Sequence, residues 1–306
     1  MINPTVRIII LNYNGASLLP QCLPSIVEAA RHASYKTVVT VLNNKSEHSG
    51  LDYVRAKFPE VVIAEAPENL VLCSYNDYLS KIDDPIVILL NNDIRTEKDF
   101  IDPLVKKFIQ DPNCFLAAPR VMSFDGSRVE AGRAKTGFKA GMFWCDARFA
   151  GYEKEVMTPS ETESSGFGAF SRKKFLDLGG YDPRYLPGIM EDVDLCLSAK
   201  RAGFSLYYEP SSVVYHMGQA TFKSTFGSRR TAVIAHRNNF RFMWKNFTGL
   251  RFWLVHLAFL PLRMVYAALR GQWAFLQGFW EAVVVREKWR PAASENIKTE
   301  ALQNAN

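Results

Sequence analysis

The chain has 306 residues, of which 48% are hydrophobic and 22% charged, so a packed globular core is expected and wholesale disorder is excluded. Its net charge of +6 and its pI near 9.0 favour an anionic partner: nucleic acid, a membrane surface or a phosphate-bearing substrate. The five cysteines are widely spaced and include no Cys-x-x-Cys pair. This argues against a zinc site or a disulfide framework and favours a reducing compartment.

The first third of the chain alternates strand and helix patterns. Strands are expected at 6–11, 36–42, 61–66 and 85–90, and helices at 17–33, 50–58, 74–82 and 97–110, the first with Ser17 as its N-cap. Short apolar strands that alternate with helices predict βαβ units and a mostly parallel sheet covered on both faces. The predicted fold class is therefore α/β.

After Cys114 the pattern becomes irregular. We expect a turn at Asp125-Gly126, an irregular aromatic stretch at 141–157, a strand and short helix at 166–178, and an amphipathic helix at 190–203 that ends at Gly203. Two short strands around a proline turn are expected at 205–217. From Phe226 onward Arg, Trp, Phe and Leu dominate without a strand pattern. We therefore predict a main domain over 1–225, a basic aromatic helical segment over 226–290 and a polar, mobile tail over 291–306.

Three polar sites follow or join these elements. The stretch "LLNND" runs from a buried strand into Asn91, Asn92 and Asp93, which indicates either a turn or a ligand site at the carboxyl end of a strand. The Glu191–Asp192 pair opens a helix, where acidic residues are also favoured by the helix dipole alone. His216 ends a strand, and a structural role is the alternative there.

These features, in this order, resemble the family-two inverting glycosyltransferases of the GT-A fold, close to their rhamnosyltransferase-like bacterial members. The resemblance covers about residues 6–225 and rests on "VRIIILNYN", "VLNNKSE", "ENLVLCSYND", "LLNND" and "GFGAFSRKKFLDLGGYDPRYLPGIMEDVDLCLSAKRAGF", followed by "YYEPSSVVYHMG". It implies a Rossmann-like, mostly parallel sheet flanked by helices, with an appended C-terminal helical segment.

The resemblance also implies roles for individual residues. Asp93 would ligate a divalent cation, Mg²⁺ or Mn²⁺, that holds the donor diphosphate, with His216 and Asn91 as further ligands. Asp192 would be the general base that deprotonates the acceptor hydroxyl, and Glu191 would hold the geometry or bind the acceptor. The implied donor-binding residues are Asn12, Tyr13, Asn43, Asn76, Asp77 and Asn92.

Two departures from the family pattern concern donor recognition. Leu42 stands where relatives carry an Asp, and "VLCSY" replaces a glycine-rich segment at 71–75. The Leu42 and Asn91 replacements support an alternative, a non-catalytic sugar-nucleotide-binding or scaffold subunit, whereas Asp93 and Asp192 argue against it. A sugar nucleotidyltransferase would need a Gly-rich, cationic loop after the first strand, and "LNYNGASLLP" offers one Gly and no cation.

The basic aromatic segment decides the expected location. Its longest apolar run, at 252–262, has 11 residues, against about 20 for a membrane span, so no spanning helix is expected. We expect interfacial helices, with packing on the main domain or on a second subunit as the alternative. The N-terminus shows no signal peptide pattern, and no nucleic-acid-binding module is found.

Together these inferences predict a cytoplasmic enzyme that is peripheral on the inner leaflet of the membrane. It would move a sugar from a nucleotide-sugar donor to a saccharide acceptor, lipid-diphosphate-linked, in cell-surface polysaccharide synthesis. Nucleic acid is not an expected partner.

Overall fold

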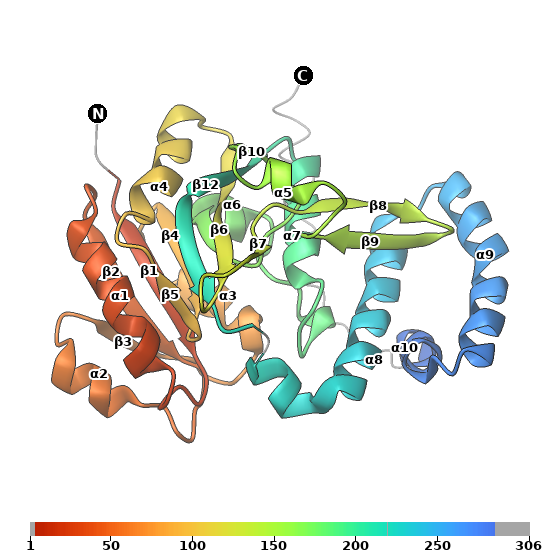
Figure 1. Ribbon diagram of the computed structural model, residues 1–306, viewed down its shortest axis with the longest axis horizontal. Coiled ribbons are helices and arrows are strands. Elements are labelled where there is room, and N and C mark those ends of the chain that lie inside the picture. The colour runs from red at the N-terminus through yellow and green to blue at the C-terminus, as the bar shows by residue number, and fades with distance from the viewer. Residues whose placement is uncertain (1–3, 219, 285–306) are drawn as a thin grey trace.

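A computed structural model describes residues 4–218 and 220–284 of the chain. Its centre is a ten-stranded sheet of order β10-β12-β6-β11-β4-β1-β2-β3, with β5 paired to β12 and β7 to β6 (Figure 1). The strands are β1 (Val6–Asn12), β2 (Thr37–Asn43), β3 (Val62–Glu65), β4 (Ile86–Asn91), β5 (Ile94–Thr96), β6 (Cys114–Ser123), β7 (Val129–Ala131), β8 (Lys135–Lys139), β9 (Met142–Asp146), β10 (Ser160–Glu161), β11 (Gly168–Ser171) and β12 (Ser205–His216). The helices are α1 (Leu19–His32), α2 (Leu51–Lys57), α3 (Ser74–Leu79), α4 (Ile101–Gln110), α5 (Tyr152–Glu155), α6 (Arg172–Asp177), α7 (Glu191–Arg201), α8 (Ala220–Asn246), α9 (Leu250–Leu269) and α10 (Trp273–Val284), with short 3-10 turns η1 (Val71–Cys73) and η2 (Pro183–Tyr185).

The β4-β1-β2-β3 half of the sheet is parallel and confirms the predicted βαβ order. The strands β1 and β4 are mainly apolar and buried because both faces of the sheet are covered there: Ile8 and Ile10 face one core cluster, and Ile9 faces the other. The carboxyl ends of β1, β2 and β4 meet at one edge, where Asn12 pairs in register with Asn43. Polar residues that end separate strands are thereby gathered in one place.

The second half of the sheet differs from the sequence-based expectation. The ten residues of β6 form a buried strand that was not predicted, and β11 runs antiparallel between β4 and β6. Residues 205–216 form one strand, β12, rather than two, because a register shift between Glu209 and Val213 absorbs the proline. The stretch expected to be irregular contributes β9 to a β8–β9 hairpin.

The turn at Asp125-Gly126 is as predicted. Gly203 was predicted to cap α7, but the helix ends at Arg201 with Ala202 as its C-cap, and Gly203 follows with a φ of 83°. The predicted N-cap Ser17 is wrong: α1 begins at Leu19 with Leu18 as its N-cap, and no side chain caps it.

The C-terminal helices extend to one side of the sheet domain, on the right in Figure 1, where the β8–β9 hairpin reaches toward α9. They share a third apolar cluster with the hairpin and with the loop before α7. This confirms the predicted helical character of the segment over 226–284. Helix α8 already begins at Ala220 and is broken at Gly227, whose φ is 73°. The predicted tail over 291–306 lies outside the described residues.

Helix α9 corrects the expectation that no helix is long enough to span a membrane. It has 20 residues, its mean hydropathy is 1.6, and 11% of it is buried. The uninterrupted apolar run of 11 residues in the sequence underestimates the length of the helix, because α9 continues through Arg263 to Leu269. Length and composition alone do not distinguish a span from a helix that lies on a surface.

Candidate active site

Asp93 and His216 lie together at the carboxyl edge of the sheet. Two residues after β4 ends, β5 pairs antiparallel with the end of β12, and His216 stands in register with Ile94. This pairing brings His216 Nε2 to 3.4 Å from Asp93 Oδ2. Asp93 is buried, and its Oδ1 has no hydrogen-bond partner in the described part of the chain. A carboxylate with a free oxygen beside an imidazole fits a divalent cation.

These two residues alone do not make a complete metal centre. Asn91, the last residue of β4, is half-buried at the same edge. Within residues 4–218 and 220–284, no group of three or more His, Cys, Asp and Glu side chains is arranged to hold a metal. A cation at this site would therefore need oxygens from water or from a bound phosphate.

Asn12 and Asn92 tie the ends of β1 and β4 together. Asn92 Nδ2 donates to Asn12 Oδ1 at 2.9 Å and to the Tyr13 carbonyl at 3.2 Å, while Asn12 Nδ2 donates to the Ser49 carbonyl at 2.8 Å. A Cβ on Gly15 would lie 1.9 Å from Asn12 Oδ1, so a larger residue there would displace this amide. The two amides are thus committed within the protein, and their contact with a donor stays a prediction.

Asn43 and Glu65 end neighbouring strands and contact each other. Asn43 Nδ2 donates to Glu65 Oε2 at 2.8 Å, and Asn43 Oδ1 has no partner among the described residues. The side chain of Leu42 is 1% exposed and packs in the core. The carboxylate expected at position 42 is therefore replaced by a core residue, and the nearby exposed carboxylate is that of Glu65.

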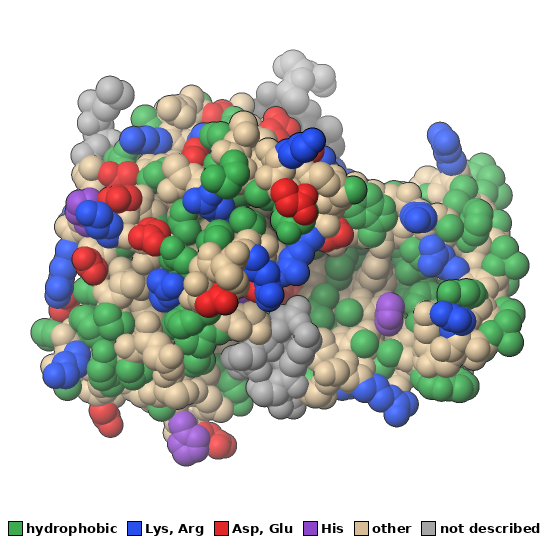
Figure 2. All heavy atoms as spheres, viewed as in Figure 1, with side chains coloured by type: hydrophobic (Ala, Val, Ile, Leu, Met, Phe, Trp, Pro, Cys, Tyr) green, Lys and Arg blue, Asp and Glu red, His purple; other side chains and the backbone are tan. Residues whose placement is uncertain are grey.

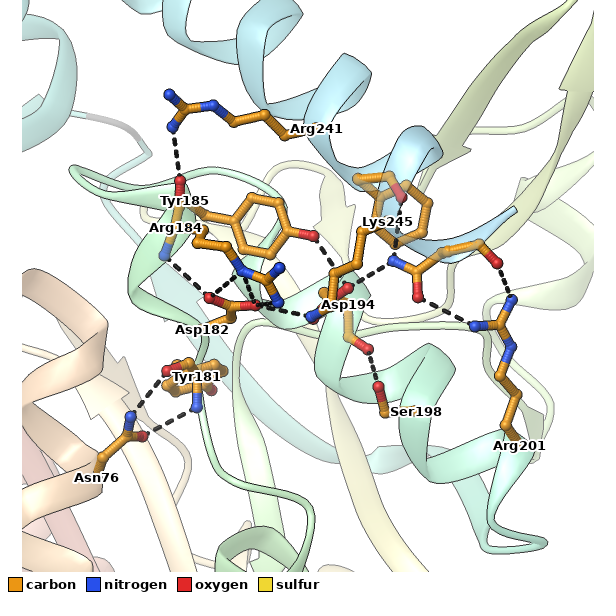
Figure 3. A network of polar contacts seen from close by, with 12 residues as sticks. Asn76, Tyr181, Asp182, Arg184, Tyr185, Asp194, Ser198, Arg201, Arg241 and Lys245 are labelled. Atoms are coloured by element: carbon orange, nitrogen blue, oxygen red, sulfur yellow. Dashed lines mark hydrogen bonds and ion pairs between the residues drawn. The ribbon is translucent and has the colours of Figure 1, made fainter. Parts of the chain in front are cut away.

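Asn76 and Asp77 have partners of their own. Asn76 Nδ2 donates to the Tyr181 carbonyl at 2.8 Å, and Tyr181 N donates to Asn76 Oδ1 at 2.9 Å, so this amide holds the Gly-Gly-Tyr-Asp turn (Figure 3). Asp77 forms an exposed ion pair with Lys81. Their predicted proximity to the donor stays a prediction.

Glu191 and Asp192 are the first two residues of α7. The residues before them, Ile189 and Met190, have φ values of 74° and 88°, and Met190 is the N-cap without a side-chain hydrogen bond. Positive φ is unfavourable for a β-branched residue and is found mainly where surrounding structure enforces it. Glu191 is buried, and its Oε2 has no partner in the described residues. Simple helix capping does not account for a buried, unpaired carboxylate oxygen.

The two carboxylates perturb each other. Burial, and then the charge of Asp192, raise the pKa of Glu191 to about 8. Burial also raises the pKa of Asp192, although the backbone N–H groups of Val193 and Asp192 counteract it. Because like charges at close range disfavour double ionisation, the pair retains a proton near neutral pH. A carboxylate poised in this range suits proton transfer.

The segment before β11 links the two acidic sites. A Cβ on Gly166 would lie 3.4 Å from Asp192 Oδ2, and the Phe167 ring packs 5.1 Å from the His216 ring. A small depression adjoins Glu191; its lining residues are Val71, Leu72, Cys73, Asp182, Tyr185, Leu186, Gly188 and Glu191. The sequence reading missed this link, because Gly166 carries no functional group to mark it.

Tyr181 was also missed as a site residue. It is 1% exposed, its hydroxyl has no hydrogen-bond partner in the described residues, and the charges of Asp192 and Glu191 raise its pKa after burial itself. Its position in the Gly-Gly-Tyr-Asp stretch of the family resemblance could have identified it from the sequence.

The α/β sheet and the acidic residues at its carboxyl edge define the class as a GT-A glycosyltransferase. The family model for glycosyltransferase like family 2 matches residues 4–234, and the chain belongs to this family. The predicted rhamnosyltransferase-like branch stays a prediction. No curated protein matches the chain.

Solved structures agree with this fold. The chain is similar to GalNAc-T7 with UDP, GalNAc and Mn²⁺ (TM-score 0.61, 17% identity, covering 78% of this chain and 47% of that one). It is also similar to the mannosyltransferase PcManGT from Pyrobaculum calidifontis with GDP-Man and Mn²⁺ (TM-score 0.55, 16% identity, covering 100% of this chain and 81% of that one). A third similar structure is S. aureus TarS (TM-score 0.50, 12% identity, covering 84% of this chain and 43% of that one). The chain thus spans about half the length of two of these three proteins.

Proposed function

We propose that this glycosyltransferase moves a sugar from a nucleotide-sugar donor to a saccharide acceptor with inversion at the anomeric carbon. The observation that carries the proposal is the Glu191–Asp192 pair, with Glu191 buried and Asp192 half-buried, linked through Gly166 and Phe167 to the Asp93–His216 pair. A site with a proton acceptor on one side and cation ligands on the other suits a displacement in which an anionic diphosphate leaves.

In this mechanism the acceptor oxygen attacks the anomeric carbon from the face opposite the leaving group. The new C–O bond forms as the bond to the nucleotide diphosphate breaks, and the acceptor proton passes to Asp192. Glu191, protonated beside it, holds the geometry or donates a hydrogen bond to the acceptor. The raised pKa of both carboxyl groups supports a pair that shares one proton near neutral pH, and the assignment of the base to Asp192 follows the family resemblance.

Asp93 and His216 would hold a Mg²⁺ or Mn²⁺ ion, with Asn91 as a ligand directly or through water. The unpartnered Asp93 Oδ1 supports this assignment, and so do the Mn²⁺ complexes of GalNAc-T7 and PcManGT. The bound cation would neutralise the diphosphate charge. Asn12, Tyr13, Asn43 and Asn92 would line the donor pocket.

Glu65 is our candidate for the carboxylate contact that Leu42 does not provide, since it is exposed beside Asn43 at the same edge. Glu65→Gln should then weaken donor binding, with Glu68→Gln on the following loop as the control.

The acceptor is proposed to be lipid-diphosphate-linked, because the C-terminal helices suit an anionic membrane surface. Residues 226–284 contain eight Lys or Arg and one Glu, and hydrophobic side chains interspersed with basic ones cover this part of the surface (Figure 2). Arg263 donates to the Lys139 and Ala140 carbonyls of the hairpin turn. A spanning α9 would draw this polar turn toward the hydrocarbon, which is costly. Peripheral attachment at the inner leaflet avoids this cost.

A thermal-shift screen of UDP-, GDP- and dTDP-sugars with Mn²⁺ or Mg²⁺ tests the proposal, because a ligand of the folded state raises Tm. We expect one donor class to bind in a metal-dependent way and nucleotide release to rise when acceptor is added. Donor binding without any release, with or without acceptor, would favour the alternative of a non-catalytic binding or scaffold subunit.

A further inference from the structure

The loop before the carboxylate pair is held in an unfavourable backbone conformation. Gly188, Ile189 and Met190 all have positive φ, at 143°, 74° and 88°. Glycine accepts such values, but Ile and Met are strained there. The loop leads directly into Glu191, so its conformation sets the direction of the first turn of α7.

Two neighbouring residues of α8 bind this loop through its carbonyl groups. Asn238 Nδ2 lies 2.6 Å from the Tyr185 carbonyl, 2.7 Å from that of Gly188 and 2.9 Å from that of Ile189, so its two N–H groups are shared among three acceptors. The Arg237 guanidinium donates to the Leu186 carbonyl. Four of the five carbonyls from 185 to 189 therefore accept from α8.

The orientation of Asn238 is itself set by its neighbour. Arg237 Nε donates to Asn238 Oδ1 at 3.0 Å, which directs the amide nitrogen toward the loop. Asn238 is fully buried, and Arg237 is 4% exposed. Water therefore does not compete at the amide. Removing it would take away the donor to the Gly188 and Ile189 carbonyls, whereas the Tyr185 carbonyl would still accept from Gly188 N at 2.9 Å.

The same face of α8 continues the contact on both sides of the loop (Figure 3). Arg241 donates to the Arg184 carbonyl at 2.8 Å, and Lys245 pairs with Asp182 at 2.7 Å and with Asp194 on α7. Asn238, Arg241 and Lys245 follow a helical spacing of three to four residues, so they lie on one face. This face of α8 spans from the loop to the first turns of α7.

We propose that Asn238 is a positioning residue for the reaction: it holds the strained loop 188–190 in the conformation that directs Glu191 and Asp192 into the site. The inference rests on the proposed function for its catalytic consequence, while its structural part stands independently. A helix of the C-terminal segment thereby completes the site of the sheet domain.

The structural part is tested by hydrogen exchange of peptides that cover 186–193, which needs no substrate. Asn238→Ala, or the milder Asn238→Ser if the first does not fold, should accelerate exchange there by about fivefold or more. The matched control is Asn239→Ala: the next amide on α8, whose Nδ2 donates to the Phe143 carbonyl of the hairpin at 3.0 Å. It should affect the hairpin and leave 186–193 unchanged. Unchanged exchange at 186–193 in the Asn238 variants would overturn the proposal.

The catalytic part is tested by nucleotide release from the nucleotide sugar that gives the largest thermal shift. Asn238→Ala should lower kcat about 10- to 100-fold, because a displacement of about 1 Å has effects of this size. Donor binding should stay within about threefold of wild type, and Asn239→Ala should keep kcat. Accelerated exchange with an unchanged kcat would overturn the positioning role.

A second substitution separates positioning from general stability. Ile189→Gly removes the penalty of positive φ, so it should restore kcat of Asn238→Ala at least about fivefold. Absence of recovery would contradict the role of Asn238 in holding the strained loop. If wild-type protein releases nucleotide from no donor, the proposed function fails, and the exchange result alone still decides whether Asn238 holds the loop.

Discussion

Glu191 and Asp192 are costly residues at the scale of single side chains. Glu191 is buried without a partner for Oε2, and both carboxyl groups have raised pKa values. A protein selected for stability alone would place a neutral residue there, and perturbed carboxyl groups of this kind concentrate at functional sites. Replacing each carboxyl group by the isosteric amide should therefore test separately its role in turnover and its cost in stability.

Asp192→Asn should lower turnover about 10²-fold or more, because the amide does not accept the acceptor proton. Donor affinity, measured by thermal shift with the preferred nucleotide sugar, should stay near the wild-type value. Turnover within a few-fold of wild type would show that Asp192 is not the base. The control is Asp177→Asn, the same substitution at an exposed residue of α6 that pairs with Lys173.

Glu191→Gln should raise Tm more at pH 9 than at pH 5. The folded-state pKa of Glu191, about 8, lies above its unfolded value near 4.5, so the free energy of unfolding falls as pH rises through this window. The glutamine removes that titration, and the gain at high pH is on the order of a few kcal/mol because each pKa unit corresponds to about 1.4 kcal/mol. Equal Tm differences at pH 5 and pH 9 would contradict the raised pKa.

At the scale of elements, one short strand assembles the proposed cation site. The three residues of β5 pair with the end of β12 and bring His216 to Asp93. A Ser25 hydroxyl on α1 also accepts from Thr96 N at 3.1 Å and fixes β5 from its other side. The metal role thus depends on a strand pairing between distant parts of the chain as well as on the residue types.

Asp93→Ala should abolish metal-dependent donor binding, and His216→Ala should weaken it about tenfold or more, the range for loss of groups that hold or orient a metal. Calorimetric titration of the donor with Mn²⁺ and with EDTA measures both effects. His32→Ala, an exposed histidine on α1 paired with Asp99, is the control. Equal wild-type affinity with Mn²⁺ and with EDTA would refute the metal assignment.

At the scale of the whole molecule, the C-terminal helices expose an apolar face that the sheet domain does not cover. Leu254, Leu262, Leu269, Trp273 and Trp280 are between 60% and 82% exposed. Their other face is committed: His256 Nδ1 lies 2.7 Å from the Gly141 carbonyl, and α10 packs on α8. The segment is therefore fixed to the protein on one side and open on the other, as expected of an interfacial surface.

The intact chain should float with anionic liposomes and be partly released by high salt, since each basic residue near such a surface contributes about 1 kcal/mol. Leu262→Glu combined with Leu269→Glu should abolish flotation. The control combines Ile109→Glu with Val62→Glu, two exposed apolar residues of the sheet domain, at 47% and 41%. A chain that ignores liposomes and forms a stable dimer sensitive to the Leu262 and Leu269 changes would overturn the membrane proposal in favour of subunit packing.

The sequence by itself determined the parallel half of the fold and the order of the polar motifs. The strands β1 and β4 are largely apolar and end in Asn12 and Asn91, so their pattern is local and readable. The strand β6 was not readable, because Pro119 and Arg120 interrupt it and its burial comes from β11 and β12 on either side. Likewise, Pro210 predicts a turn between two strands. The structure shows one strand, β12, because β6 pairs with the residues before and after the irregularity.

Only the tertiary structure decided which partners each polar side chain has within the chain. Asn12, Asn92 and Asn76 resemble ligand-binding residues in sequence, yet each amide is engaged in tying one loop to another. Asn238 carries no motif, yet it binds three carbonyls of the loop before Glu191. The reason is physical: a residue type limits which hydrogen bonds a side chain can make, whereas its partners depend on which distant segments the folded chain brings within 3 Å or so.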